Sequence, residues 1–89
     1  MKKKYLIVVH RADGNFSAHS PDVDGCIATG GTVEETVKNM RSALEFHFEG
    51  MEEDGDLLPE PRPLADHIEA AESADYMAVF EYEQEKMAV

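Results

Sequence analysis

The sequence is poor in cysteine, and it has no tryptophan and no long hydrophobic run. With Cys26 as its only cysteine, the chain of 89 residues cannot form an internal disulfide, which is typical of proteins in a reducing compartment. The apolar run that follows Lys4 ends at His10, far short of the ~20 residues that a spanning helix needs. We therefore expect a cytoplasmic protein with no signal peptide and no membrane partner.

Basic residues are also scarce, and their shortage is uneven along the chain. Eight Lys and Arg stand against nineteen Asp and Glu, giving a net charge of −11. Residues 1–50 hold six basic and seven acidic side chains, whereas residues 51–89 hold two and twelve, net −10. Such a surface lacks the basic patch that nucleic-acid binding requires. It favours a basic protein partner, although the charge could also serve solubility alone.

The first half of the chain reads as three short strands. Residues 5–10 are apolar and β-branched on both faces, which predicts an inner strand. Asp13-Gly14 is a hairpin signal, and residues 16–20 should return antiparallel, with His10 opposite His19. Pro21 and Gly25 predict a turn over residues 20–26, and residues 26–29 make the third strand.

A long amphipathic helix should follow over residues 33–54. Thr32 and Glu35 have the spacing of a capping box, Gly50 should weaken the last turn, and Gly55 should end the helix. Its apolar positions recur every three or four residues, at Val33, Val37, Met40, Leu44, Phe48 and Met51.

The remaining residues complete one domain spanning residues 1–89. Residues 57–63 form a proline-stiffened linker, residues 64–74 have a weak helical pattern, and residues 76–82 alternate as a fourth strand. The prediction is an α+β fold with a three- to four-stranded, mostly antiparallel sheet in β-β-β-α-β order and one long helix on one face. The other face stays apolar and uncovered, so we expect a homodimer or higher homo-oligomer.

No catalytic or metal site emerges from the motifs, and no cofactor is expected. Residues 25–32 have the spacing of a phosphate loop, but Gly31 stands in place of the essential lysine. Asp22 and Asp24 share a loop, yet the first strand offers no acid to complete a two-metal cluster. His10, His19 and Cys26 make at most an incomplete zinc site. Cys26 has no electropositive setting that would make it a nucleophile.

Three motifs in their order resemble the HicB-type antitoxin family. They are SPDVDGC at residues 20–26, GGTVEE at residues 30–35 and PEP at residues 59–61, and the resemblance extends over residues 4–82. Two positions depart from the family pattern: Asp24 stands where proline is frequent, and Gly31 where an acidic residue is frequent. The matching positions that should form turns and the helix cap are Pro21, Asp22, Gly25, Cys26, Gly30, Thr32 and Glu35.

The resemblance implies an incomplete RNase H-like fold and an antitoxin that neutralises a HicA-type toxin, a small basic ribonuclease that cleaves mRNA. The chain ends soon after its last strand, so we expect it to lack the DNA-binding module that many family members carry. A cryptic metal-dependent nuclease or a stand-alone oligomeric regulatory domain remain as alternatives. Residues predicted to contact the toxin are the acids Asp22, Asp24, Glu49, Glu52, Glu53 and Asp54.

Overall fold

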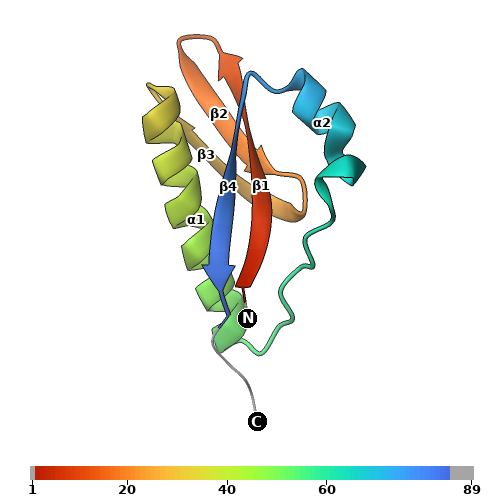
Figure 1. The fold of residues 1–89 in the computed structure, drawn as a ribbon. Helices are drawn as coiled ribbons and strands as arrows, with labels where there is room; N and C mark the ends of the chain where they lie inside the picture. Colours follow the sequence, from red (N-terminus) through yellow and green to blue (C-terminus); the bar gives the residue numbers. More distant parts are fainter. Residues whose placement is uncertain (1, 85–89) are drawn as a thin grey trace.

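The computed structural model describes residues 2–84, which form a four-stranded antiparallel sheet with a long helix on one face (Figure 1). The elements in chain order are β1 (Lys2–Ala12), β2 (Asn15–Ser20), β3 (Val23–Gly30), α1 (Val33–Glu53), η1 (Leu64–His67), α2 (Ile68–Ser73) and β4 (Tyr76–Glu83). The strand order across the sheet is β3-β2-β1-β4. Helix α1 lies on one side of the sheet and α2 on the other (Figure 1). The predicted α+β fold is confirmed, with all four strands antiparallel.

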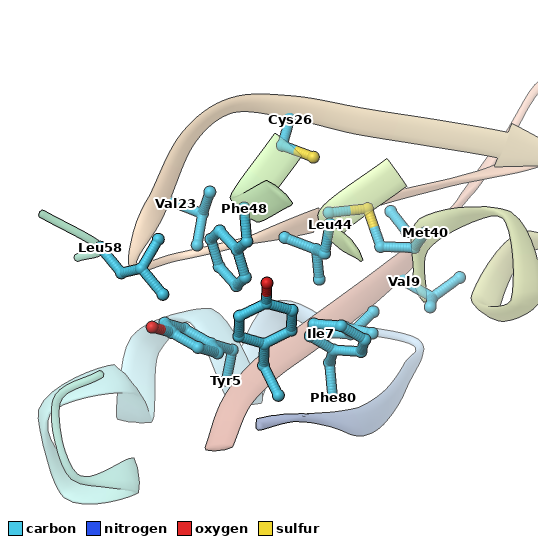
Figure 2. Close-up of a cluster of buried hydrophobic side chains, with 12 residues drawn as sticks. Tyr5, Ile7, Val9, Val23, Cys26, Met40, Leu44, Phe48, Leu58 and Phe80 are labelled. Atoms are coloured by element: carbon cyan, nitrogen blue, oxygen red, sulfur yellow. The ribbon is translucent and has the colours of Figure 1, made fainter. Parts of the chain in front are cut away.

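The apolar first strand, β1, is an inner strand, as predicted. It pairs with β2 on one edge and with β4 on the other. Because alternate side chains of a strand point to opposite faces, Tyr5, Ile7 and Val9 all face α1, and all three are fully buried. In Figure 2 they lie among Leu44 and Phe48 of the helix, and the rings of Tyr5 and Phe48 are 4.8 Å apart between centroids. This cluster is the core of the domain.

The turn between β1 and β2 lies one residue nearer the N-terminus than the predicted pairing required. Asp13 and Gly14 both lie in the turn, and Gly14 has φ +78°. The register therefore moves by two residues, so that His10 lies opposite Ser17 instead of His19. The two histidines are diagonal neighbours on one face, and their rings stack with centroids 5.6 Å apart. The predicted contact exists, but the predicted register was wrong.

The turn between β2 and β3 is shorter than predicted. Only Pro21 and Asp22 lie between the strands, and β3 begins at Val23 instead of residue 26. The bend is taken up inside the strand, where the pairing register shifts beside His19 and Gly25 adopts φ +78°. Such an irregularity suits glycine, which has no Cβ to clash in the left-handed region. Residues expected in a loop thus belong to a bulged strand.

Helix α1 begins at a hydrogen-bonded cap. The Thr32 hydroxyl accepts a hydrogen bond from the Glu35 amide at 3.0 Å, and the Glu35 carboxylate accepts one from the Gly31 amide at 2.8 Å. The two side chains thereby bind amides that have no partner within the helix. Just before the cap, a Cβ added to Gly30 would lie 2.6 Å from the hydroxyl of Thr36. Only glycine fits where the end of β3 meets the helix.

The helix continues through Gly50 to Glu53, so the expected early weakening does not interrupt it. Gly55 ends it with φ +78°, and the Asp56 amide donates to the Met51 carbonyl at 2.8 Å. This is the bonding of a Schellman cap, which satisfies carbonyls at the end of a helix. The closed cap holds the final turn despite the helical glycine.

The last third of the chain returns to the sheet along two short helices. Residues 57–63 have no regular structure, but Leu58 inserts into the core beside Phe48 (Figure 2). The predicted helical segment appears as η1 and α2, followed by β4. In β4, Phe80 and Tyr82 are buried on the core side, which confirms the predicted alternation. Tyr76 is more exposed and meets the ring of Phe16 edge to face.

Candidate functional site

Asp22 forms a buried polar cluster that joins the β2–β3 turn to the linker. Its side chain is only 4% exposed. It accepts hydrogen bonds from the amide of Arg62 at 3.0 Å and from the guanidinium of Arg62 at 2.9 Å. Nε2 of His67, itself buried, lies 2.9 Å from the same carboxylate. We call these three residues the Asp22 clasp.

The clasp sets the charge of Asp22. Burial by itself raises the pKa of this carboxyl group, but the hydrogen bonds from Arg62, the hydrogen bond from His67 and the charge of His67 together outweigh burial. The net effect lowers the pKa of Asp22 below its ordinary value of 3.8. The carboxylate therefore stays ionised at neutral pH and is occupied by intramolecular donors.

Two further contacts hold the linker to β1. The hydroxyl of Tyr5 donates to the carbonyl of Pro59 at 2.7 Å, and the ammonium group of Lys3 pairs with Glu60 at 2.7 Å. Burial, followed by the nearby charges of Glu60 and Asp22, raises the pKa of Tyr5 to about 12. Together with the clasp, these bonds fix the linker in one path across the sheet.

The acids predicted to contact a partner do not all lie at the surface. Asp24, Glu49, Glu53 and Asp54 are exposed. Glu52 is half-buried and accepts a hydrogen bond from the Tyr82 hydroxyl at 2.9 Å. Asp22 is buried in its clasp, which leaves almost none of its carboxylate for another molecule. Asp22 therefore binds groups within the domain, namely Arg62 of the linker and His67 of η1. The turn motif around Asp22 gave no sign of these distant donors.

The residues considered for metal or nucleophilic chemistry do not converge. Burial raises the pKa of the Cys26 thiol, which disfavours the reactive thiolate. The stacked pair of His10 and His19 has no third ligand, and residues 2–84 contain no group of three or more His, Cys, Asp or Glu side chains placed to hold a metal ion. Burial and the neighbouring His10 lower the pKa of His19. The arrangement resembles a packed surface pair and lacks the geometry of a metal centre.

A groove and an apolar patch lie on the sheet face opposite α1. The groove has a volume of about 590 Å³ between β1, β4 and the linker, and Leu6, Leu64 and Val79 line it together with Lys2, Lys4 and Arg62. Exposed apolar side chains continue along it, and we call the group of Leu64, Ile68, Met77 and Val79 the sheet patch. Val8, on the same strand face, is completely buried, so this face is covered only in part. The sequence indicated an uncovered face but did not single out these residues.

Comparison with known proteins agrees with this fold and with the motifs along it. A family model described as the HicB-like antitoxin of bacterial toxin–antitoxin systems matches residues 5–86, nearly the whole chain. The chain belongs to the HicB-like antitoxin family. In this HicB-like domain the turn motif supplies the clasp carboxylate and the glycine-threonine motif supplies the helix cap.

Solved structures show the same architecture. The N-terminal domain of the antitoxin HicB from Burkholderia pseudomallei superposes with a TM-score of 0.78 at 26% identity, covering 91% of this chain and 99% of that one. The antitoxin HicB3 superposes with a TM-score of 0.74 at 26% identity, covering 97% of this chain and 68% of that one. A chain of the HicA3 and HicB3 toxin–antitoxin complex shares the fold, with a TM-score of 0.65 at 24% identity over 90% of this chain and 95% of that one.

A sequence relative extends beyond the length of this HicB-like chain. It is an uncharacterized 14.9 kDa protein from the rep-hol intergenic region of Haemophilus phage HP1, 34% identical over 73 residues. The match covers 82% of this chain and 55% of the phage protein, so the chain spans about half the length of that relative. Among residues 2–84, no helix is both long and apolar enough to cross a membrane.

Proposed function

We propose that this HicB-like protein is an antitoxin that binds a small basic HicA-type toxin and blocks its cleavage of mRNA. The family match over residues 5–86 carries the proposal. The net charge of −11 supports it, because an acidic surface attracts a protein built to bind RNA and competes with the phosphate backbone for it. Neutralisation then follows from occlusion of the RNA-binding surface. Both proteins are expected in the cytoplasm, where mRNA is available.

Co-expression tests this function. A candidate HicA-type toxin, a short basic protein, is induced alone and together with this chain, and growth and mRNA integrity are followed. We expect growth arrest and mRNA cleavage with the basic protein alone, and relief of both when this chain is present. Persistent arrest despite a soluble antitoxin would contradict the function.

The antitoxin acts in this proposal by binding, without catalysis of its own. Purified protein incubated with RNA and Mg²⁺ or Mn²⁺ should leave the RNA intact, because its acids do not converge in residues 2–84. RNA cleavage that Asp24→Asn abolishes would replace the antitoxin proposal with the nuclease alternative.

Direct binding of nucleic acid by this domain is also not expected, because its charge repels phosphates. A gel shift with operator DNA at physiological salt should show no retarded band. A clear salt-sensitive shift would contradict this expectation.

We further propose that the domain self-associates through the sheet patch. Met77 and Val79 are half-exposed apolar side chains on β4, an edge strand, and two copies related by a twofold axis would cover each other's patch. Sedimentation should therefore give a dimer or a higher oligomer. Val79→Glu should shift the protein to monomers, whereas a wild-type monomer at high concentration would refute the interface.

A further inference from the structure

A second groove, of about 540 Å³, runs between α1 and β3, on a different side of the molecule from the sheet patch. β3 is an edge strand of the sheet. Residues from both elements line the groove, among them Gly25, Ile27, Ala43, Phe46, Gly50 and Asp54. Three of these six carry at most a methyl group, so the wall they form is low and open. We call this the α1–β3 groove.

Two large apolar side chains stand in solvent at the α1–β3 groove. Phe46 is 80% exposed and Ile27 is 66% exposed. Phe46 lies outside the apolar stripe that α1 turns to the sheet, so core packing does not account for an aromatic residue there. Exposed aromatic side chains beside a concavity are the residues that most often anchor protein interfaces.

The charges around the groove are acidic. Asp54 and Asp56 line it, and its lining includes no Lys or Arg among the residues described. Glu49 and Glu53 follow Phe46 by three and seven residues, which places them on the same side of the helix. The helix therefore presents one aromatic ring among several carboxylates.

We propose that the α1–β3 groove receives the basic toxin, through an arginine-bearing segment that covers Phe46. This inference rests on the proposed antitoxin function and assigns it a surface. A guanidinium stacks on the face of an aromatic ring and at the same time pairs with a carboxylate, and Glu49 lies one helical turn from Phe46. The groove beside the sheet patch is lined by lysine and arginine, so it repels the same partner.

The structure offers a variant that blocks the groove without damaging the fold. A Cβ added to Gly50 meets no atom within 4 Å, and arginine favours a helix more than glycine does. Gly50→Arg therefore fills the groove and places a positive charge beside its two aspartates, while the thermal midpoint stays equal or rises. Gly50→Ala is the matched control, because it makes the same change to the backbone and adds only a methyl group.

A second set of variants separates the ring from the charges. Phe46→Ala removes the exposed aromatic side chain, and Glu53→Lys reverses a charge on the same side of the helix. Glu45→Lys makes an identical charge change on the side of α1 that faces β4, where Glu45 lines a different hollow with Val79 and Phe80. It is the control for net charge.

Affinity for the purified HicA-type toxin that the co-expression test identifies is measured by calorimetry for each variant. Loss of a central aromatic anchor should weaken binding about 30-fold, and we expect about 100-fold for Gly50→Arg. Glu53→Lys should weaken binding several-fold, and less at high salt. Gly50→Ala and Glu45→Lys should stay within about threefold of wild type.

The outcomes distinguish the surface from the function. Binding by Gly50→Arg and Phe46→Ala within threefold of wild type would overturn the groove and leave the antitoxin function standing. Failure of the wild-type protein to bind or to rescue growth would overturn both. In NMR spectra, the amide resonances of residues 25–27 and 46–50 should shift when the partner is added. Shifts confined to β4 would instead place the contact at the sheet patch and refute the groove as the binding site.

Discussion

Removing the carboxylate of Asp22 should destabilise the domain far more than removing an exposed acid two residues away. In Asp22→Ala the buried Nε2 of His67 and the amide of Arg62 both lose their partner. A buried polar group without a partner costs about 1–3 kcal/mol, and a hydrogen bond to a charged group contributes about 1.5–3 kcal/mol. The side chain of Arg62 is 56% exposed, so its guanidinium binds water instead and the ion pair adds little. We expect the free energy of unfolding to fall by about 2–4 kcal/mol.

Urea and thermal unfolding followed by circular dichroism at neutral pH measure this loss. For a domain of this size each kcal/mol shifts the thermal midpoint by about 4–8 °C, so the midpoint of Asp22→Ala should fall by about 8–32 °C. Asp24→Ala is the matched control, because Asp24 is exposed and its substitution should change the free energy by less than about 0.5 kcal/mol. Equal stability of the two variants would refute the clasp.

The clasp also predicts the direction of the pH dependence. The pKa of Asp22 is lowered in the folded state, so the unfolded chain takes up the proton first as the pH falls. The contribution of Asp22 is therefore complete above about pH 4 and is lost progressively below it, as the pH falls through the lowered pKa. Asp22→Asn should lack this part of the acid transition. An unchanged acid profile would contradict the assignment.

Three further predictions test the rest of the fold. Gly30→Ala should destabilise the domain, because its methyl group meets the backbone of α1. Gly50→Ala adds its methyl group in open space and should raise the free energy of unfolding by up to about 1 kcal/mol. Equal effects of the two substitutions in urea unfolding would contradict this packing. Thr32→Ala should cost about 1 kcal/mol by removing the helix cap, and an unchanged urea midpoint would argue against that cap. Tyr5 and Tyr82 should ionise near pH 12 in an ultraviolet absorbance titration, because burial, with nearby glutamates, raises their pKa from 10 to about 12. Unfolded tyrosine loses its proton first, so stability should decline above pH 10, and ionisation of both rings at pH 10 would refute their burial.

The elements of this HicB-like domain were predictable where short-range patterns determine them. Alternation placed Tyr5 and Phe80 on the core side of their strands, and a three-to-four spacing placed Met40, Leu44 and Phe48 against the sheet. These assignments hold because the burial of apolar side chains follows the period of each element. Pairing registers were less accessible. The His10–His19 register depended on whether one or both residues of Asp13-Gly14 entered the turn, a choice that the motif alone does not make.

The candidate site shows the same division. The exposure of Phe46 could be predicted from the sequence, because this aromatic residue lies outside the apolar stripe of the helix. The groove beside Phe46 could not be predicted, because it also depends on the position of β3 relative to α1. The role of Asp22 had no local signal. Its partners lie 40 and 45 residues further along the chain, and only the folded linker brings them to the turn.

Sequence by itself determined the family, the order of the elements and the acidic character of the surface, because each depends on residue type and short spacing. Tertiary structure decided which acids remain available to a partner. It buried Asp22 against Arg62 and His67 and left Glu49, Glu53 and Asp54 in water beside an exposed ring. The physical reason is that charge is a property of a residue, whereas its accessibility depends on side chains that the fold brings from distant parts of the chain.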